Sequence, residues 1–350
     1  MRIVITGATG NVGTALLRRL ATETDIDVVG IARRPPGPDA GPPYDRVEWH
    51  AADLGDDNCV EPLTEWFSGA DAVVHLAWQI QPSHRRAQLR RTNLTGTRHT
   101  VDAIVRAGVR SLVYASSVGT YMPGPKDLGV DEDWPTAGVP RSGYSVDKAA
   151  VELMLDGVER EHPSLRVVRL RKALIFQRDA GAEISRYFLG PVAPFVLRRI
   201  GRVLIIPTNK RLRTQALHAD DAAEAYLRAL RADVRGAFNL AAEPVLDGPM
   251  FAKLTGGWTV PLPLGLLRML VNTTWRARIQ PTDPGWFNLL VSLPLMDCSR
   301  AERELGWRPR RDAREALREL LAGVAAEAGT SGPALRPGGV RSRATQRRTT

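Results

Sequence analysis

The sequence predicts an α/β protein built on a doubly wound parallel sheet, with a smaller C-terminal α+β lid for the substrate. Short β-rich runs alternate with helical segments through the first half of the 350 residues. A glycine-rich turn follows the first run, and the alternation loosens after about residue 172. With 43% hydrophobic and 25% charged residues, the chain can bury a full core.

Each β-rich run of the first half is followed by a segment with helical periodicity. A chain that alternates in this way forms βαβ units, which place parallel strands in one sheet and helices on both of its faces. We therefore expect residues 1–172 to form one domain around this sheet. The runs are RIVIT (2–6), DVVGIA (27–32), RVEWHA (46–51), DAVVHLA (71–77), SLVYASS (111–117) and LRVVRL (165–170).

After residue 172 the pattern changes to helices separated by isolated strands. We expect residues 173–328 to form mainly a substrate-binding lid, with some segments that return to the core of the first domain. The expected helices span residues 180–200, 220–231, 263–272 and 311–327, and the expected strands span 214–218 and 236–240.

Residues 329–350 differ in composition from the rest of the chain. They contain five Arg and no acidic residue, and thus carry half of the net charge of +10. Because they hold few apolar and no aromatic residues, we expect them to form a disordered basic tail. Deleting this tail is then expected to leave the stability of the protein unchanged. Elsewhere basic residues are mixed with acidic ones, so we expect no specific nucleic-acid partner.

Cysteine content and hydropathy argue against a disulfide-rich, metal-binding, secreted or membrane protein. Cys59 and Cys298 are too few for a disulfide framework and too far apart for a metal-ligand motif. No His, Cys or carboxylate spacing predicts a metal site. The first predicted strand begins at Arg2 without room for a secretory signal, and the longer apolar stretches are interrupted by Arg and Pro. We expect a cytoplasmic protein without a membrane partner.

The glycine-rich turn GATGNVG follows the first predicted strand directly and begins a helix. Gly7 permits a tight turn, Gly10 lets a phosphate approach the backbone, and Gly13 allows close packing of the helix. The N-terminus of that helix then faces a pyrophosphate. In this position the motif predicts a dinucleotide-binding Rossmann domain, although its Gly-x-x-Gly-x-x-Gly spacing differs by one residue from the usual fingerprint.

Tyr144 and Lys148 are four residues apart in the segment SGYSVDKA. Ser-Gly is typical of a helix start, and the residues after Lys148 continue with helical periodicity, so both side chains are expected on one helix face. A phenol with a pKa of about 10 is poorly matched to neutral pH, and a positive charge nearby favours the phenolate. The spacing therefore predicts a pair that can transfer a proton.

With these two motifs the chain resembles the extended short-chain dehydrogenase/reductase family, also described as the NAD-dependent epimerase/dehydratase family. The resemblance covers residues 1 to about 325, and it is much more specific for the family than for the substrate. Its supporting motifs are HLAW (75–78), NLTGT (93–97), YASSVGTY (114–121), HADDAAEAY (218–226), NLAAEP (239–244) and LGWRP (305–309).

The resemblance implies four catalytic residues. The family's tyrosine exchanges a proton as hydride moves to or from nicotinamide, which implies this role for Tyr144, while Lys148 binds the nicotinamide ribose and lowers the pKa of Tyr144. Ser117 takes the position of the hydroxyl that hydrogen-bonds the reacting oxygen, with Ser116 as the weaker candidate. Asn93 supports Lys148 through water, or else is a helix cap or a surface amide. The expected cofactor-binding residues are Gly7, Thr9, Gly10, Asn11, Val12, Gly13, Arg33, Arg34, Asp53, Leu54, Leu76 and Ala77, besides Tyr144 and Lys148.

Four further polar residues fall in family segments. Asp53 matches the acid that meets the adenine amino group in relatives, or else caps a helix. His75 lies in a buried strand pattern and is expected to be a hydrogen-bonded core residue. His218 and Asp220 are expected to form a turn and a helix cap.

The residues after the second strand favour NADP over NAD. NAD enzymes of this fold place Asp or Glu there to bind the ribose 2′-hydroxyl, whereas this chain has Ala32 followed by Arg33 and Arg34. No carboxylate is present at this position to repel a phosphate, and Arg suits bidentate phosphate contacts. Because an arginine can also stack on adenine without contacting a phosphate, NAD stays the alternative.

Two departures from the family bear on the reaction. Its dehydratases carry Thr-Asp-Glu where this chain has Ser117, Val118 and Gly119, so the acid and base for water elimination are missing. Its members that act on sugar nucleotides carry an Asn-x-Tyr-Gly-Pro run, whereas this chain has Leu174 at the asparagine position. This difference argues against a nucleotide-sugar substrate without excluding it. The lid offers apolar runs and tryptophans that suit a less polar substrate or form the lid core: Trp258, Trp275 and Trp286.

Three functions agree with these observations. The first is an NADP(H)-dependent oxidoreductase that reduces a carbonyl or oxidises a secondary alcohol of a small molecule. The alternatives are an NAD-dependent sugar-nucleotide epimerase and a non-catalytic dinucleotide-binding or sensing protein, and the intact Ser117, Tyr144 and Lys148 argue against the latter. The resemblance also suggests a homodimer through the helices at 84–107 and 144–161.

Overall fold

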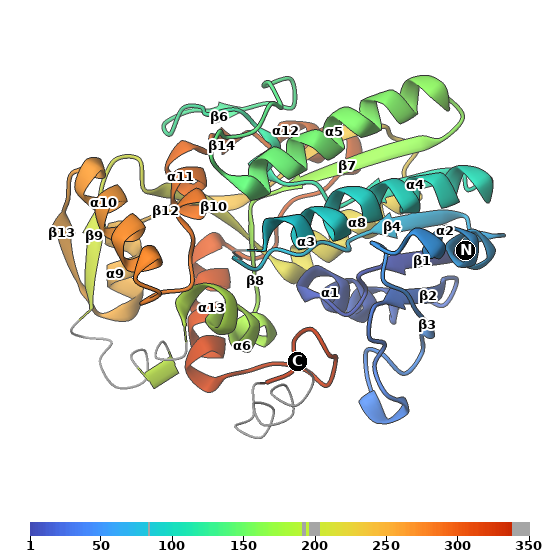
Figure 1. Ribbon diagram of the computed structural model, residues 1–350, viewed down its shortest axis with the longest axis horizontal. Coiled ribbons are helices and arrows are strands. Elements are labelled where there is room, and N and C mark those ends of the chain that lie inside the picture. The colour runs from blue at the N-terminus through green and yellow to red at the C-terminus, as the bar shows by residue number, and fades with distance from the viewer. Residues whose placement is uncertain (83–84, 191–193, 196–203, 338–350) are drawn as a thin grey trace.

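A seven-stranded parallel sheet forms the centre of the molecule (Figure 1). The computed structural model describes residues 1–82, 85–190, 194–195 and 204–337. The strand order β11-β7-β5-β4-β1-β2-β3 confirms the predicted doubly wound sheet, in which ligands bind beyond the carboxyl ends of the strands where the order reverses. The strands are β1 (Arg2–Thr6), β2 (Asp27–Ala32), β3 (Glu48–Ala51), β4 (Ala72–His75), β5 (Ser111–Tyr114), β7 (Arg166–Lys172) and β11 (Gly236–Leu240).

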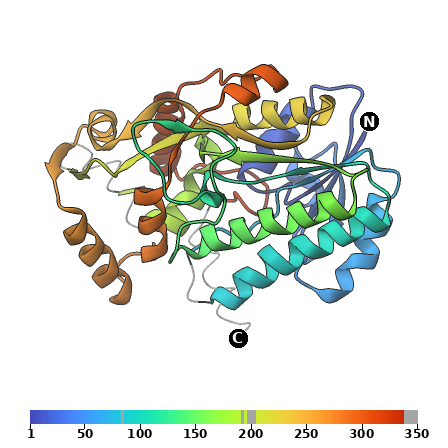
Figure 2. The ribbon, with the colours of Figure 1, turned by 90° about the horizontal axis from the view of Figure 1, so that it is seen from above.

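Helices cover both faces of this sheet (Figure 2). Successive residues of a strand point to opposite faces, so Ile3 and Ile5 of β1 pack with Leu16 of α1 and Ala222 of α8, while Val4 packs on the other side. The second face is covered by α2, α4 and α5. The helices are α1 (Asn11–Leu20), α2 (Val60–Phe67), α4 (Gly96–Arg106), α5 (Gly143–Glu161) and α8 (Ala219–Arg231), with α3 (Arg86–Arg90) leading into α4.

The C-terminal part forms a smaller body with short sheets and helices, on the left in Figure 1. Its sheets pair β8 (Leu174–Phe176), β10 (Arg213–His218) and β12 (Ala242–Asp247), then β9 (Ile205–Thr208) with β13 (Trp258–Pro261), and β14 (Leu295–Met296) with β6 (Gly129–Val130). Its helices are α6 (Gly181–Ile184), α9 (Gly248–Thr255), α10 (Leu264–Arg276), α11 (Pro284–Ser292) and α13 (Ala313–Ala326), whereas α12 (Ser299–Leu305) packs against β11 and α8.

Segments after residue 172 return to the central sheet. β11 pairs with β7 as the outer strand, and α8 packs against α1. The ranges expected for strands at 214–218 and 236–240 correspond to β10 and β11. Only part of the helix expected at 180–200 lies within the described residues, where α6 continues into a helical turn over Ser185–Leu189.

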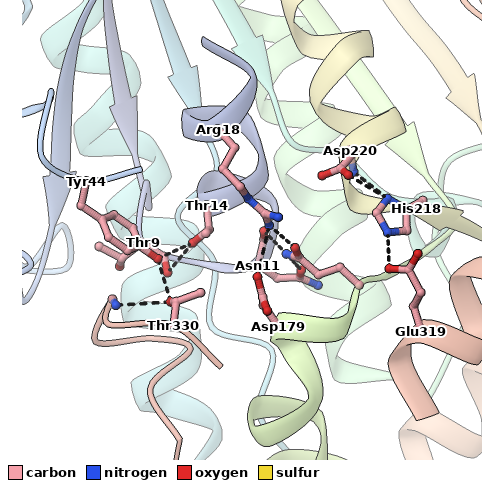
Figure 3. Close-up of polar contacts among 12 residues, drawn as sticks. Thr9, Asn11, Thr14, Arg18, Tyr44, Asp179, His218, Asp220, Glu319 and Thr330 are labelled. Carbon is pink, nitrogen blue, oxygen red and sulfur yellow. Dashed lines mark hydrogen bonds and ion pairs between the residues drawn. The ribbon is translucent and has the colours of Figure 1, made fainter. Parts of the chain in front are cut away.

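The segment 329–337 packs against the first domain instead of extending from it. Leu335 is fully buried, and its carbonyl accepts a hydrogen bond from the Thr330 N–H (3.1 Å), which closes the segment into a turn. The Thr330 hydroxyl lies 2.8 Å from the Tyr44 hydroxyl, which in turn lies 2.9 Å from the Thr14 hydroxyl on α1 (Figure 3). A chain of three hydroxyl groups therefore links this segment to the helix of the glycine turn.

A further contact joins the same segment to the lid, because Arg186 donates to the Ala334 carbonyl (3.1 Å). The structure thus corrects the expected start of a disordered tail at residue 329. The prediction failed here because a composition averaged over the segment does not register one apolar side chain, Leu335, that finds a buried site. Residues 338–350 lie outside the described residues.

Removing residues 329–350 is expected to lower the melting temperature by several degrees, whereas removing only 338–350 leaves these contacts in place and the melting temperature unchanged. Burying a leucine side chain contributes about 1.5–3 kcal/mol. In domains of 150–250 residues, 1 kcal/mol corresponds to roughly 2–4 °C. Scanning calorimetry of both truncated proteins beside the full chain measures the difference, and three equal melting temperatures would contradict a stabilising role for the segment.

None of the helices within the described ranges combines the length and hydropathy needed to cross a membrane. The same part of the chain contains no group of three or more His, Cys, Asp or Glu side chains that could hold a metal ion. Cys59 and Cys298 are free thiols, and burial raises their pKa values to about 11 and about 12. Both are therefore protonated and poorly reactive at neutral pH.

Candidate active site

The turn after β1 contains three glycines, and at two of them, Gly7 and Gly13, a side chain does not fit. Gly7 has a φ of 72°, and a Cβ atom there would lie 2.6 Å from the Ala77 backbone nitrogen. A Cβ atom on Gly13 would lie 2.5 Å from the Ala8 carbonyl oxygen. Gly10 precedes α1 and donates its N–H to the Gly7 carbonyl (3.0 Å). The turn therefore presents bare backbone ahead of a helix N-terminus, the arrangement that binds a pyrophosphate.

A cleft of about 220 Å³ adjoins this turn at the carboxyl edge of the sheet. Its polar groups come from the glycine turn and from the ends of β2 and β3, and its apolar walls suit an adenine ring. These residues fit the phosphates and the adenosine of a dinucleotide. The predicted cofactor residues that line the cleft are Gly7, Thr9, Gly10, Arg33, Arg34, Asp53, Leu54, Leu76 and Ala77.

Asn11, Val12 and Gly13 do not line this cleft. The Asn11 side chain donates to the Ile175 carbonyl (3.2 Å), and the Gln177 amide donates to the Asn11 side-chain oxygen (2.6 Å; Figure 3). Asn11 thus ties the start of α1 to the strand β8 of the other body. These residues shape the site by packing, and a direct contact with the cofactor stays a prediction for them.

Arg33 and Arg34 are exposed at the end of β2 and line the cleft. Within the described ranges neither makes an ion pair or a hydrogen bond, so both guanidinium groups are available to a ligand. The same cleft is lined by Glu183 and Tyr187, which the sequence did not predict. Burial raises the pKa of the Glu183 carboxyl to about 7, so this side chain is only partly ionised at neutral pH.

Tyr144 lies in the first turn of α5 and faces the loop that follows β5. Ser117 lies in this loop, and its hydroxyl accepts a hydrogen bond from the Gly119 N–H (3.0 Å). Burial raises the pKa of Tyr144 to about 12, and a hydrogen bond with Ser117 opposes this rise. The Trp286 ring, 4.8 Å away between centroids, packs against the phenol. The structure thus places two of the predicted catalytic side chains close together beside Gly119.

Gly119 leaves room for the ring of Tyr144. A Cβ atom on Gly119 would lie 2.7 Å from the Tyr144 Cε1 atom and 3.3 Å from the Ser117 hydroxyl oxygen. The family's dehydratase pattern requires a glutamate side chain at this position. No such side chain fits here while the phenol keeps its place.

Lys148 lies one turn after Tyr144, but its ammonium group points into the protein. Its Nζ atom donates to the Ala115 carbonyl (2.7 Å) and to the Tyr114 hydroxyl (3.1 Å). The indole ring of Trp78 covers the ammonium, with 3.6 Å between Nζ and the ring centroid. The ribose contact that the resemblance implies for Lys148, and its lowering of the Tyr144 pKa, stay predictions.

Asn93 lies in a π-helical turn over Arg91–Thr95, between α3 and α4. Its side chain is buried, donates to the Gln79 carbonyl (3.0 Å) and accepts from the Gln79 N–H (2.8 Å). A π-turn is frequently found at functional sites, because it redirects a side chain that a regular helix would point elsewhere. Asn93 therefore fixes the segment after β4 and is neither a helix cap nor a surface amide.

A larger pocket of about 840 Å³ opens in front of Tyr144, between α5 and the lid. Trp275 of α10 and Trp286 of α11 form part of its wall. Trp258, on β13, is 73% exposed and does not contribute. Of the three tryptophans that the sequence offers either for substrate contact or for the lid core, two therefore line the pocket.

The same pocket carries more charge than the sequence suggested. Arg86, Arg141 and Arg268 line it, together with several side-chain amides. Arg86 is paired with the buried Asp147 (2.9 Å), whereas Arg141 and Arg268 make no ion pair with the described residues. These arginines come from α3, α10 and a loop, and their convergence has no signal in the sequence, so the less polar substrate stays a prediction.

The segment 79–81 separates the cleft from the pocket and lines both of them. The two cavities are therefore neighbours with a common wall, which Asn93 holds in place through Gln79. Tyr144 lines the pocket but not the cleft.

The family model described as the NAD-dependent epimerase/dehydratase family matches residues 3–241. The chain belongs to this family. Its enzymes include those of the extended short-chain dehydrogenase/reductase class that the motifs indicated.

Relatives of this epimerase/dehydratase family member differ in length and in name. An uncharacterised protein of Mycobacterium tuberculosis is 30% identical over 326 residues, which cover 93% of this chain and 30% of that protein. The chain thus spans about a third of the length of that relative. The decarboxylating sterol-4-alpha-carboxylate 3-dehydrogenase of Saccharomyces cerevisiae is 33% identical over 135 residues, or 38% of this chain and 37% of that protein.

Among solved structures, a UDP-glucose 4-epimerase of Stenotrophomonas maltophila with bound NAD has a TM-score of 0.70. The two sequences are 20% identical, and the alignment covers 93% of this chain and 98% of the epimerase chain. At this identity the likeness shows that the family's fold is shared.

In this family member several polar residues outside the catalytic motifs have a structural role. His75 is buried between the hydroxyls of Thr6 (2.6 Å) and Thr97 (3.0 Å), and burial lowers its pKa to about 3, so it is a neutral core residue as predicted. His218 accepts the Asp220 N–H (3.1 Å) and caps α8, also as predicted (Figure 3).

Asp53 stabilises a local turn and also lines the cleft. Its carboxylate accepts the Gly55 N–H (3.0 Å) and pairs with Arg91 (3.2 Å). The contact with an adenine amino group stays a prediction.

Sequence reasoning missed Trp78, Glu183, Tyr187 and Ala334, which line the cleft in this family member. Trp78 had a signal, since it ends the motif HLAW. Glu183 and Tyr187 lie in a range where only a helix was expected, and Ala334 lies in the expected tail. These three reach the cleft through tertiary packing of segments far from the glycine turn, which no local pattern encodes.

Proposed function

We propose that this chain is an NADP(H)-dependent oxidoreductase that reduces a carbonyl group, or oxidises a secondary alcohol, of a small molecule. The observation that supports this most is the position of Tyr144 beside Ser117 at the substrate pocket, next to the dinucleotide cleft. When bound, the nicotinamide supplies or accepts the hydride.

In the proposed reduction, Tyr144 donates a proton to the substrate oxygen while the Ser117 hydroxyl hydrogen-bonds the same atom. The raised pKa of about 12 keeps Tyr144 protonated at neutral pH, so the residue is ready to act as an acid. Oxidation requires the phenolate and therefore depends on a positive charge near Tyr144, the role proposed for Lys148. The same residue is thus the proposed acid of the reduction and the proposed base of the oxidation.

A second candidate is an NAD-dependent epimerase that acts on a sugar nucleotide. Arg141 and Arg268 in the pocket suit an anionic substrate, and the structurally similar proteins include UDP-glucose 4-epimerases. Leu174 at the family's asparagine position argues against this candidate. A dehydratase has less support, since Gly119 leaves no space for its glutamate.

A homodimer through α4 and α5 belongs to the same proposal. The two helices run side by side on one face of the molecule (Figure 2), and Leu153 of α5 is 70% exposed there. A hydrophobic side chain on such a surface suits a subunit contact.

Replacing Arg33 with Ala is expected to weaken NADPH binding by about 10- to 150-fold and NADH binding far less, because a charge-assisted hydrogen bond to phosphate contributes about 1.5–3 kcal/mol. Replacing Ala32 with Asp is expected to shift the preference in the same direction, since the new carboxylate repels the phosphate and accepts from the ribose hydroxyl. Fluorescence titration of each protein with NADPH and NADH measures both constants.

The matched control for this titration is Arg110→Ala, which removes an arginine that is 84% exposed and lies outside the cleft. It is expected to leave both affinities unchanged. If wild type binds NADH as tightly as NADPH, or if Arg33→Ala weakens both equally, the arginines do not read the phosphate and the epimerase becomes the better proposal. Mass spectrometry of any nucleotide released on denaturation distinguishes tightly held NAD from exchangeable NADP.

A further inference from the structure

A second buried lysine lies directly behind Ser117. Lys172 ends β7 and forms a parallel backbone bridge with Ser117. Its Nζ atom donates to the Ser116 carbonyl (3.0 Å), to the Leu170 carbonyl (3.3 Å) and to the Tyr226 hydroxyl (2.8 Å). The side chain is buried and makes no ion pair with any described residue. An ammonium group in the core is thus compensated only by carbonyl and phenol dipoles.

The two buried lysines hold consecutive carbonyl groups just before Ser117. Lys148 binds the Ala115 carbonyl from α5, and Lys172 binds the Ser116 carbonyl from β7. Because the backbone of residues 115–116 determines where the next residue lies, the two ammonium groups fix Ser117 from opposite elements. Nothing in the sequence motifs indicated the second of these anchors.

Like charge couples the two lysines. Burial lowers the pKa of Lys148 well below its usual value, the charge of Lys172 lowers it further, and Glu152 opposes both effects. Burial also lowers the pKa of Lys172 to about 7. The titratable groups that face this region come from three elements packed around Lys172: Tyr114 on β5, Tyr144, Lys148 and Glu152 on α5, and Tyr226 on α8.

Glu152 does not neutralise Lys172, because its carboxylate is already engaged. It pairs with Arg169 (3.1 Å) and Arg171 (2.9 Å) and accepts a hydrogen bond from the Ser116 hydroxyl. When both lysines are protonated, the charge of Lys172 therefore acts on Lys148 without a carboxylate that neutralises Lys172.

We propose that Lys172 is a positioning residue of this site, whose charge state controls Lys148 and whose contact with the Ser116 carbonyl holds Ser117 against Tyr144. The catalytic part of this inference rests on the proposed function. Loss of the charge on Lys172, by deprotonation or by substitution, removes this repulsion and lets the pKa of Lys148 rise toward its usual value. The pH profile of kcat is then expected to contain a limb near neutral pH that does not belong to Tyr144.

The first test needs no substrate, because the chain contains only five lysines. In protein labelled with ¹³C at the lysine Cε atoms, NMR follows each titration, and single variants assign the signals. Lys172→Met is expected to remove a signal that titrates near neutral pH and to raise the midpoint of Lys148 by about 1 pH unit or more, the size typical of a nearby charge. Equal Lys148 midpoints in wild type and Lys172→Met would overturn the proposed coupling.

Lys126→Met is the matched control for this experiment. Lys126 is also buried, donates to the Arg213 (2.8 Å) and Leu290 (2.7 Å) carbonyls, and has a pKa that burial lowers to about 7. It contacts neither lysine of the site. Its replacement is expected to leave the Lys148 midpoint unchanged, so a change of the same size in this variant would also overturn the proposal.

The second test measures turnover of the ketone or aldehyde that wild type reduces fastest with NADPH. Lys172→Met is expected to lower kcat by roughly 10- to 100-fold, the cost of misplacing a catalytic group, with the KM for NADPH unchanged. The arginine in Lys172→Arg keeps its charge at every pH, so the limb of the kcat profile near neutral pH is expected to disappear. Lys172→Arg also serves as the test variant if Lys172→Met does not fold. If both Lys172 variants show the wild-type pH profile of kcat while Tyr144→Phe is inactive, the role of Lys172 is contradicted and the proposed function stands. If Tyr144→Phe is active, the proposed function itself is contradicted.

Discussion

Replacing Tyr144 with Phe is expected to reduce kcat by about 10²- to 10⁴-fold, the usual contribution of a general acid, while the dissociation constant of the dinucleotide changes little. The variant keeps the ring that packs on Trp286 and fills the space beside Gly119, so only the transferable proton and its hydrogen bond with Ser117 are lost. Steady-state kinetics with NADPH and fluorescence titration of the nucleotide measure the two quantities separately.

Tyr121→Phe is the matched control, since it also deletes one buried phenol hydroxyl. The Tyr121 hydroxyl donates to the Asn239 side chain (2.6 Å) and accepts from Arg171 (3.1 Å), outside the substrate pocket. This change is expected to reduce stability and to leave kcat unchanged at temperatures where the variant is folded. If Tyr144→Phe retains about a tenth or more of the wild-type kcat, Tyr144 is not the acid.

Replacing Glu152 with Ala is expected to lower the free energy of unfolding by about 3–5 kcal/mol, the cost of leaving buried charges without their partner. The Glu152 side chain is 1% exposed and is the carboxylate shared by Arg169 and Arg171. Without it, the Arg171 guanidinium keeps only the hydroxyl of Tyr121 and a backbone carbonyl. Urea unfolding followed by circular dichroism measures the loss.

Asp156→Ala is the comparison for Glu152→Ala, because Asp156 binds the same guanidinium of Arg169 from a position that is 43% exposed. A partly exposed ion pair contributes about 0–1 kcal/mol, so the loss is expected to be small. Losses of equal size in the two variants would show that burial of Glu152 does not determine its contribution.

The acid limb of the stability curve is expected to depend on the same carboxylate. Burial opposes ionisation of Glu152, but Arg171 and Arg169 hold its pKa below the usual value. A carboxyl whose pKa is lower in the folded state stabilises the fold above its unfolded-state pKa of about 4.3, and this stabilisation is lost as the pH falls through the folded-state value. Wild type should therefore lose stability below about pH 4 more steeply than Glu152→Gln, which urea unfolding between neutral and acid pH would test.

The parts of the site that the sequence predicted are those whose geometry is local. The glycine turn follows from backbone conformation within a few residues of Gly7, and the Tyr144–Lys148 pair follows from the repeat of one helix. The direction of the Lys148 ammonium group depends on the carbonyl of Ala115, just after β5, and on Trp78, which distant segments place around it. Glu183 reaches the cleft in the same non-local way, through packing of a short helix.

The order in which the strands join the central sheet has a consequence for how the protein is made. Six of the seven strands are synthesised by residue 172, but β11 and α8, which complete the edge at β7 and cover α1, emerge much later. Until then the growing chain carries an unpaired strand edge and an uncovered apolar helix face, both of which favour association with other chains. Contacts between segments so far apart in sequence also slow folding. Residues 1–172 made alone are thus expected to aggregate, because the nucleotide-binding half becomes a folding unit only after the lid has begun to be translated.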